Sequence, residues 1–239
     1  ILYSPVDFLG YPTLNNKGDQ LAWIEWKQPS MPWDSSQLWW GRVNELGEIN
    51  EEKPVAGSNM NKKAEIAVFQ PIWLRNDQLV VSEDSSGWSN LIIADFQKKS
   101  SSNSLPQWKR MWPMESESSM PQWVHGMSTT AAAEEILISA NCQNGAWRLN
   151  LLGLDGSQEQ YHQPFNDLSL IKADKSHVVA LASNSHKAPG LLEIDLESGS
   201  WMYTPTGANQ LDESLISKPE SFWFEGFNGE KTHSWYYPP

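Results

Sequence analysis

Short runs in which large apolar residues alternate with polar ones dominate the chain, and polar turn segments such as "NNKGD", "SSGWSN" and "NCQNGA" separate them. Alternation with a period of two predicts strands that bury one face, and Gly, Asn, Asp and Ser in the separators predict turns. Helical periodicity is weak, because its best candidate, Thr129 to Ile138, begins with alanines and ends in the strand-like "ILIS". The main predicted strands cover residues 20–26, 36–43, 78–84, 90–96, 135–140, 147–152, 177–183, 190–196 and 200–204.

The runs recur as a unit. "YPTLNNKGDQLAWIEW" (11–26) and "QPIWLRNDQLVVSED" (70–84) share a proline, a large residue two positions later, a polar turn, then Gln-Leu and an apolar strand. "MPQWVHGMS" (120–128) repeats the start, so the proline anchors Pro12, Pro71 and Pro121 lie 59 and 50 residues apart, and a weaker unit follows Pro164. Such repetition predicts an all-β β-propeller of four-stranded antiparallel blades, with about four blades between Tyr11 and Pro205. A β-sandwich with coincidental prolines is the alternative.

Two polar segments, "QKKSSSNS" (97–104) and "MESESSM" (114–120), lie between predicted strands, and we expect them to be solvated loops. The tail "SFWFEGFNGEKTHSWYYPP" (221–239) reads as two aromatic arms around Asn228-Gly229, a strong hairpin signal because both residues tolerate positive φ. A hairpin alone is marginally stable in water and needs a partner layer.

Composition narrows the function classes. The formal charge is −12, which argues against nucleic acid or an anionic membrane as a partner. The single cysteine, Cys142, excludes an internal disulfide, and neither a long apolar span nor a charged-then-apolar leader is present. We therefore expect a cytoplasmic protein. Because the sequence starts with Ile1 and not with Met, we take its start to be either a processing boundary or the edge of a piece cut from a longer chain. The 14 tryptophans favour packed sheets in repeated units.

A serine hydrolase would need a Gly-x-Ser-x-Gly turn followed by an acid and a histidine. The segments beginning at Gly87 and Gly126 lack the last glycine, and the five histidines follow no such turn. Metal-ligand spacings and phosphate-binding glycine loops are also missing from the sequence. We predict no catalytic residue, no metal and no cofactor for this chain, and Cys142 has no base partner that would make it a nucleophile.

Three segments in order, "PSMPWDSSQLWWGRV" (29–43), "VFQPIWLRNDQLVVSEDSSGWSNL" (68–91) and "MPQWVHGMS" (120–128), resemble the propeller domain of prolyl-oligopeptidase-type serine peptidases. Within these, the chain is most similar to the acylaminoacyl-peptidase and dipeptidyl-aminopeptidase-like branch. The tail from 215 to 239 resembles the crossover into the catalytic domain. The resemblance implies a propeller portion at 1–215 and, at 216–239, the crossover and first hairpin of an α/β-hydrolase domain that this chain lacks.

The resemblance also implies a role. The propeller would be a non-catalytic filter that admits short peptides or acyl-peptides to the hydrolase domain, its partner in the same parent protein. The family's propellers have more blades than are recognisable here, which implies a partial arc with exposed edges and possible homo-oligomers. Two other functions stay open: a stand-alone TolB-like propeller that binds a protein or carbohydrate, and a small-propeller glycosidase, which would need two inward carboxylates.

Five residues are candidates for facing the substrate. Trp33, Asp34 and Trp88 lie in the segments that carry the resemblance, although a tryptophan beside a turn more often covers a blade core. Glu134-Glu135 is an acidic pair, and dipeptidyl-peptidase relatives hold a substrate amino group with such a pair. Against this, neighbouring strand residues point to opposite faces, and the pair also fits a charged turn.

Overall fold

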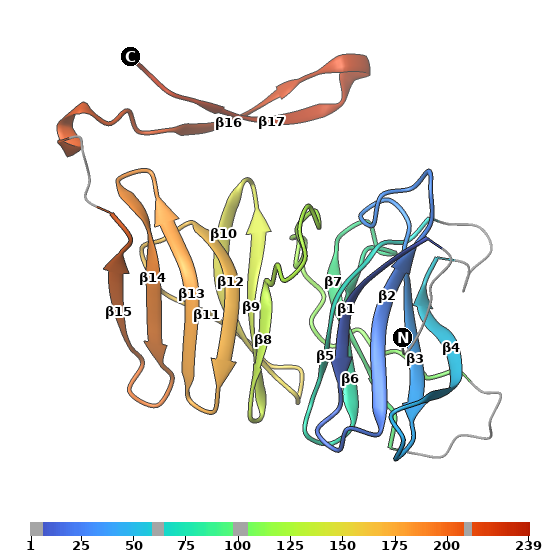
Figure 1. The fold of residues 1–239 in the computed structure, drawn as a ribbon. Helices are drawn as coiled ribbons and strands as arrows, with labels where there is room; N and C mark the ends of the chain where they lie inside the picture. Colours follow the sequence, from blue (N-terminus) through green and yellow to red (C-terminus); the bar gives the residue numbers. More distant parts are fainter. Residues whose placement is uncertain (1–6, 59–64, 98–104, 208–211) are drawn as a thin grey trace.

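The structure is a computed structural model that describes residues 7–58, 65–97, 105–207 and 212–239. Antiparallel sheets follow one another along the chain, and a separate hairpin lies across one end of them (Figure 1). The described residues form no α-helix, only two single-turn 3-10 helices near the C-terminal end, at Glu213–Leu215 and Phe227–Gly229. The all-β prediction is therefore confirmed.

Four sheets form the body of the molecule, and within each one the strands are neighbours in the order of the chain. The first sheet contains β1 (Phe8–Leu14), β2 (Gln20–Trp26), β3 (Gln37–Val43) and β4 (Ile49–Gly57). The second contains β5 (Val68–Trp73), β6 (Gln78–Glu83) and β7 (Asn90–Asp95). The third contains β8 (Thr130–Ala133), β9 (Ile136–Gln143), β10 (Ala146–Gly153) and β11 (Gln158–Tyr161). The fourth contains β12 (Asp167–Asp174), β13 (His177–Asn184), β14 (Lys187–Asp195) and β15 (Ser200–Pro205).

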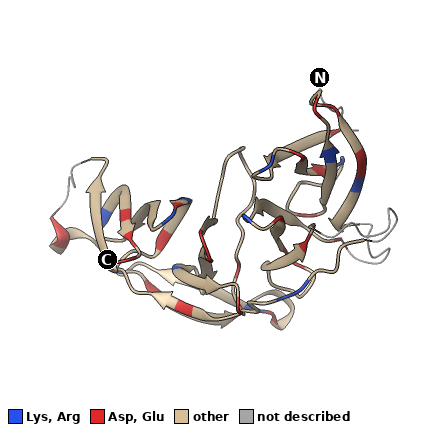
Figure 2. Cartoon of the chain, turned by 90° about the horizontal axis from the view of Figure 1, so that it is seen from below, with Lys and Arg blue, Asp and Glu red and all other residues tan. Residues whose placement is uncertain are grey.

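The four sheets are arranged as propeller blades. The first strands of successive blades contact each other, β1 with β5, β5 with β8 and β8 with β12, so the blades extend outward from a shared centre. Seen from below, the blades follow one another from the N-terminal sheet to the fourth, with acidic residues on every sheet and basic residues scattered among them (Figure 2). The prediction of about four antiparallel blades is confirmed.

The second blade departs from the four-strand pattern. Its outer position holds a single bridge, in which Ile93 and Lys109 exchange two backbone hydrogen bonds of 3.0 and 2.9 Å. Pro106 and Pro113 flank this segment, and proline cannot donate to a ladder, which limits pairing to this one point.

Each pair of neighbouring blades encloses an apolar core. In β6, Leu79 and Val81 face the core between blades one and two, whereas Val80 faces the core between blades two and three. In β9, Leu137 belongs to the second of these cores and Ile138 to the one between blades three and four. Successive strand residues point to opposite faces, so a blade buried on both faces has an unbroken apolar run instead of alternation. This explains the unbroken apolar runs "LVV" (79–81) and "ILI" (136–138).

A bulge repeats in the inner strands. Tyr11, Gln70 and Leu170 have positive φ values of 54°, 51° and 53°, and each lies where the register of its inner strand shifts by one residue. Pro12 and Pro71 follow the first two bulges and are equivalent. Pro121 and Pro164 lie before β8 and β12, so their use as anchors of the same position was wrong.

The polar segment 114–120 is packed, which contradicts the expected solvated loop. Ser116 and Ser118 are buried, and Glu117 forms a two-bond bridge with Cys142 of β9. The Thr129 hydroxyl also donates to the Ser118 carbonyl at 2.6 Å. These long-range hydrogen bonds let small polar residues be buried without an unmet donor or acceptor. Of the other expected loop, 97–104, all but residue 97 lies outside the described residues.

The predicted hairpin forms, with β16 (Glu220–Glu225) paired to β17 (Lys231–Tyr236). Asn228 and Gly229 in its turn have φ values of 57° and 77°, as expected for residues that tolerate the left-handed region. The hairpin lies at the end of the molecule that carries the β2–β3, β6–β7, β9–β10 and β13–β14 connections (Figure 1). We call this the hairpin end of the molecule.

Candidate functional site

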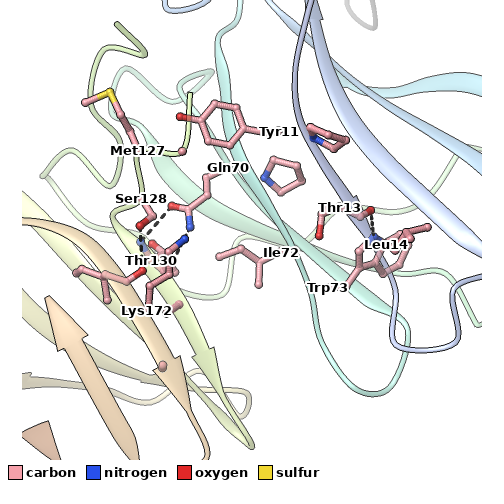
Figure 3. Close-up of a pocket in the computed structure, with 16 residues that line it drawn as sticks. Tyr11, Thr13, Leu14, Gln70, Ile72, Trp73, Met127, Ser128, Thr130 and Lys172 are labelled. Carbon is pink, nitrogen blue, oxygen red and sulfur yellow. Dashed lines mark hydrogen bonds between the residues drawn. The ribbon is translucent and has the colours of Figure 1, made fainter. Parts of the chain in front are cut away.

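The inner strands line an open cavity of about 310 Å³ at the centre of the blades (Figure 3). Residues of all four blades line it, among them Thr13, Gln70, Trp73, Thr130 and Lys172. The indole nitrogen of Trp73 donates to the Thr13 carbonyl at 3.1 Å and joins the first two blades beside this space. The cavity occupies the position of a propeller's central channel.

The side chain of Gln70 joins blades two and three within this cavity. Its Oε1 accepts from the backbone N–H groups of Thr129 at 2.9 Å and Thr130 at 3.2 Å, and its Nε2 donates to the Thr130 carbonyl at 2.5 Å. The bulge that places Gln70 at positive φ points the amide at the start of β8 (Figure 3). Gln70 thus satisfies backbone groups that have no strand beside them at this point.

Tyr11, at the equivalent bulge of blade one, lies between the central cavity and the hairpin end. Its ring packs edge-on against Phe69, with centroids 5.5 Å apart. Burial raises the pKa of Tyr11 to about 12, because the phenolate loses hydration there.

The structure separates the five sequence candidates into two groups. Trp33, Asp34 and Trp88 belong to the β2–β3 and β6–β7 connections, at the hairpin end. Glu134 and Glu135 form the β8–β9 turn at the opposite end, where Glu134 lies 3.6 Å from Arg75 and both carboxylates are exposed. The acidic pair is therefore a charged turn, far from the other candidates.

At the hairpin end the molecule has a pocket of about 490 Å³ with largely apolar walls. Trp26, the last residue of β2, and residues 28–32 after it form one side of it, and residues 122–125 form the other. We call it the aromatic pocket, defined by Phe8, Trp26, Met31, Gln122, Trp123 and His125. Trp123 is 71% exposed, so a large apolar surface is available at its rim.

A second pocket of about 410 Å³ lies on the other side of Gln122. We call it the acidic pocket, defined by Trp33, Phe69, Asp84, Ser89, Glu117 and Gln122. Asp84 accepts a hydrogen bond from the Ala67 N–H at 2.9 Å, and Glu117 accepts one from the Ser89 N–H at 2.9 Å. Burial is the main cause that raises the pKa of Asp84, with the nearby Glu83 charge adding to it.

Gln122 and two tryptophans form the boundary between the pockets. The rings of Trp33 and Trp123 lie 4.4 Å apart between centroids, with one ring at each pocket. The Nε2 of Gln122 donates to the Val68 carbonyl at 3.0 Å, which fixes the orientation of its amide. Its Oε1 is buried and has no hydrogen-bond partner in the part of the chain that the structure describes.

Hydrolytic chemistry of the serine-peptidase kind would need a serine hydroxyl beside a histidine. Ser221 and His233 of the hairpin lie 2.8 Å apart, Oγ to Nε2, on an exposed surface. No carboxylate hydrogen-bonds this histidine in the described residues, so the pair lacks the third member of a triad. Burial raises the pKa of the Cys142 thiol, which disfavours its thiolate. Residues 7–58, 65–97, 105–207 and 212–239 contain no group of three metal-ligating side chains and no helix able to cross a membrane.

Comparison with known proteins adds structural relatives. No protein-family model and no curated protein matches the sequence. A puromycin-hydrolysing peptidase from Mycobacterium tuberculosis matches over 100% of this chain and 35% of its own, with a TM-score of 0.87 and 21% identity. The fold is that of a β-propeller. A puromycin hydrolase matches over 97% of this chain and 34% of its own, with a TM-score of 0.86 and 24% identity.

Prolyl oligopeptidase B from Galerina marginata is a more distant relative, with a TM-score of 0.71, 16% identity, and coverage of 95% of this chain and 30% of its own. The chain therefore spans about a third of the length of the solved structures it matches. At this level of identity the likeness establishes a shared propeller fold.

Sequence reasoning missed Asp84, Glu117, Gln122 and Trp123. Three of them lie in segments that had drawn attention, "SEDSSGW" and "MPQWVHG", but the tryptophans and the Glu-Glu pair stood out more. Glu117 lies in the segment taken for a solvated loop. The signal that could have found them is that both segments carry family-like motifs between predicted strands, where binding loops occur.

Proposed function

We propose that this chain is the propeller portion of a prolyl-oligopeptidase-type serine peptidase and that it limits which peptides reach a catalytic α/β-hydrolase domain. The likeness over the full length of the chain to the puromycin-hydrolysing peptidase carries this proposal. In the same scheme residues 1–215 belong to the propeller, and residues 216–239 begin the hydrolase domain.

The exposed hairpin supports a following domain. All six residues of β16 are exposed, with Trp223 53% and Phe227 of the turn 87% accessible. A two-stranded hairpin gains little stability by itself, and aromatic side chains on both its faces need a partner layer. The hairpin end, with its two pockets, would then face the catalytic domain.

The proposed role in access follows from geometry. Side chains and backbone of the four inner strands line the central cavity. Its volume of about 310 Å³ has room for a short stretch of extended peptide and none for a folded protein. The substrates we propose are short peptides. The narrower assignment to acylaminoacyl peptidases rests on the sequence motifs alone, and the cytoplasmic location rests on the cysteine content.

Peptidase assays test the proposal. The parent protein, with the hydrolase domain attached, should cleave aminoacyl- or acyl-anilides, and a serine-directed phosphonate should abolish the activity. It should also cut a short peptide while sparing the same sequence inside a folded protein. The 239-residue chain alone should show no turnover. Phosphonate-sensitive turnover by the chain alone, or a reading frame that stops at Pro239, would favour another function, the stand-alone binding propeller.

The fourth blade suggests how copies could associate. Leu191 and Met202 lie on its face that points away from blade three and are 41% and 59% exposed. We include self-association through this face in the proposal; light scattering that gives a monomer at all concentrations would remove it.

A further inference from the structure

The dipeptide Asn-Gly occurs twice in the chain, and both copies lie in turns that join antiparallel strands. Asn144-Gly145 joins β9 to β10, and Asn228-Gly229 lies between β16 and β17. The φ values are 52° and 72° in the first turn and 57° and 77° in the second. All four residues are exposed to solvent. By sequence, by these φ values and by exposure the two turns are therefore alike.

An asparagine before glycine can react with its own backbone, because glycine has no side chain to shield its nitrogen. The glycine nitrogen attacks the asparagine Cγ, and the new C–N bond closes a five-membered succinimide ring. The side-chain nitrogen leaves as ammonia and carries away the proton of the glycine N–H. Water then opens the ring at one of its two carbonyls and gives aspartate or isoaspartate. Water is the only co-reactant, and nothing is oxidised or reduced.

The folded hairpin turn holds these reacting atoms apart. Asn228 has a ψ of 22°, so the Gly229 nitrogen and the Asn228 β-carbon lie on opposite sides of the bond between Cα and the carbonyl carbon. The five-membered ring can close only after the turn opens locally and this bond rotates. The rate of the reaction then follows the free energy of local opening, which differs widely between parts of one protein.

The turn at Asn228-Gly229 should open at low cost. All six residues of β16 are exposed, and a two-stranded hairpin is marginally stable by itself. Within the turn, the Gly229 N–H donates to the Gly226 carbonyl at 3.2 Å. Next to Gly229, the nearest atom to an added β-carbon is the end of the flexible Glu225 side chain, at 3.3 Å. Packing therefore does little to keep this turn closed.

The turn at Asn144-Gly145 should open at high cost. Its strand β9 is buried on both faces, with Leu137 in one core and Ile138 in the next. The indole nitrogen of Trp235 also covers the turn, 2.6 Å from the place of an added β-carbon at Gly145. Opening this turn would disturb two cores, so structure separates two dipeptides that the sequence leaves equal.

We propose that Asn228 is a site of spontaneous covalent modification, at which the side chain cyclises to a succinimide and becomes aspartate or isoaspartate, while the fold protects Asn144. Isoaspartate adds one carbon to the backbone of a short turn, and turn length fixes the register of a hairpin. Either product also adds a negative charge close to Glu225 and Glu230. The modified hairpin should lose strand pairing and leave its place against blade three.

Incubation of the 239-residue chain at mildly alkaline pH tests the proposal. Peptide mapping by mass spectrometry follows both asparagines over time and separates aspartate from isoaspartate. In the folded chain Asn228 should convert at least about tenfold faster than Asn144, because its turn opens more often. In denaturant, where both turns are lost, the two should convert at similar rates. Equal rates in the folded chain, or an Asn228 that converts only in denaturant, would overturn the proposal.

Two glycine variants test the consequence for the hairpin. Asn228→Gly keeps a residue that tolerates positive φ but has no side-chain amide, and Asn144→Gly is its match in the other turn. On ageing, tryptic cleavage after Lys231 should become faster in the wild type and in Asn144→Gly but not in Asn228→Gly. Equal loosening of Asn228→Gly would show that this modification does not detach the hairpin. None of these measurements uses peptidase activity, so they stand or fall separately from the proposed function.

Discussion

The indole nitrogen of Trp235, in the terminal hairpin, occupies the space that a side chain at Gly145 would need. A β-carbon built at Gly145 would lie 2.6 Å from this nitrogen, far inside van der Waals contact. Gly145 forms the tight β9–β10 turn at a φ of 72°. The contact fastens the hairpin to the third blade, and it requires glycine for both space and backbone conformation.

Gly145→Ala should therefore detach the hairpin from blade three. The expected result is faster tryptic cleavage after Lys231, an exposed residue of β17. Mass spectrometry of the digest at successive times measures this rate. Gly18→Ala is the matched control, since Gly18 has a φ of 73° but no atom within 4 Å of an added β-carbon. Both variants bear the backbone cost of about 1 kcal/mol, and only the first adds the clash.

A double variant sharpens this prediction. Trp235→Ala alone should also speed cleavage after Lys231, and adding Gly145→Ala to it should have little further effect, because the clash is gone. If the two changes add in full, the Trp235–Gly145 contact does not hold the hairpin.

Removing the Gln70 amide should loosen the joint between blades two and three. Gln70→Ala leaves two N–H groups and one carbonyl of Thr129 and Thr130 without their partner, and should lower the free energy of unfolding by about 2 kcal/mol. Denaturant unfolding measures it. Gln160→Ala on the exposed strand β11 is the control and should change stability by less than about 0.5 kcal/mol.

Gln70→Gly separates backbone from side chain. It relieves the positive φ of 51° while still deleting the amide. We expect the glycine variant to be more stable than Gln70→Ala by about 1 kcal/mol, the strain that it relieves. If Gln70→Ala is as stable as the wild type, the three hydrogen bonds contribute nothing and the bridging role is wrong.

Much of the fold could be predicted because its strands are governed by local rules. The runs at 78–84 and 90–96 are bounded by turns, and both match strands within one residue at each end. Their unbroken apolar character also fits a blade buried on two faces, as Val80 and Val81 show. Period and turn chemistry need only neighbouring residues, and the sequence displays both.

The site could not be predicted in the same way, because it depends on contacts between distant segments. Ser118 looks like a solvated residue until its carbonyl meets Thr129 and its N–H meets the Ser89 carbonyl at 2.7 Å. Glu117 and Asp84 come together through two different connections. Glu134-Glu135 stood out in the sequence. A short strand that was not predicted, β8, comes directly before the pair and places it at the end of the blade opposite to the hairpin end.

Stability at high pH should depend on Tyr11. Its pKa in the fold is raised to about 12 by burial, above the value near 10 of an unfolded chain. The buried neutral phenol is compatible with the fold below pH 10, and stability falls as pH rises toward 12, because only the unfolded state ionises freely. Each pH unit of this window removes at most about 1.4 kcal/mol of stability. Solvent screens the partly exposed phenol, so the total loss should be about 2 kcal/mol.

Tyr11→Phe should flatten the pH dependence between about pH 10 and 12 relative to the wild type. Tyr237→Phe is the control, because Tyr237 is 61% exposed and its replacement should leave the slope unchanged. Free energies of unfolding measured by denaturant titration at several pH values give both slopes. Identical slopes for Tyr11→Phe and the wild type would show that this phenol ionises equally in both states.

Trp112 should be the most sensitive tryptophan of the second blade. It is 0% exposed, it packs in the core between blades two and three, and its indole nitrogen donates to the Gly153 carbonyl at 2.9 Å. It follows the single bridge at Lys109, so it fixes a segment that has no full strand pairing. Trp112→Ala should cost about 3–5 kcal/mol, and Trp112→Phe, which keeps a ring but orphans the carbonyl, about 1–3 kcal/mol.

The surface residue Trp201 gives the matched comparison, since it is 41% exposed on β15 and Trp201→Ala should cost less than about 1.5 kcal/mol. Thermal and denaturant unfolding of the three variants test the order. If Trp112→Ala were no worse than Trp201→Ala, the segment after Lys109 would not be held by core packing, and the truncated second blade would need another explanation for its order.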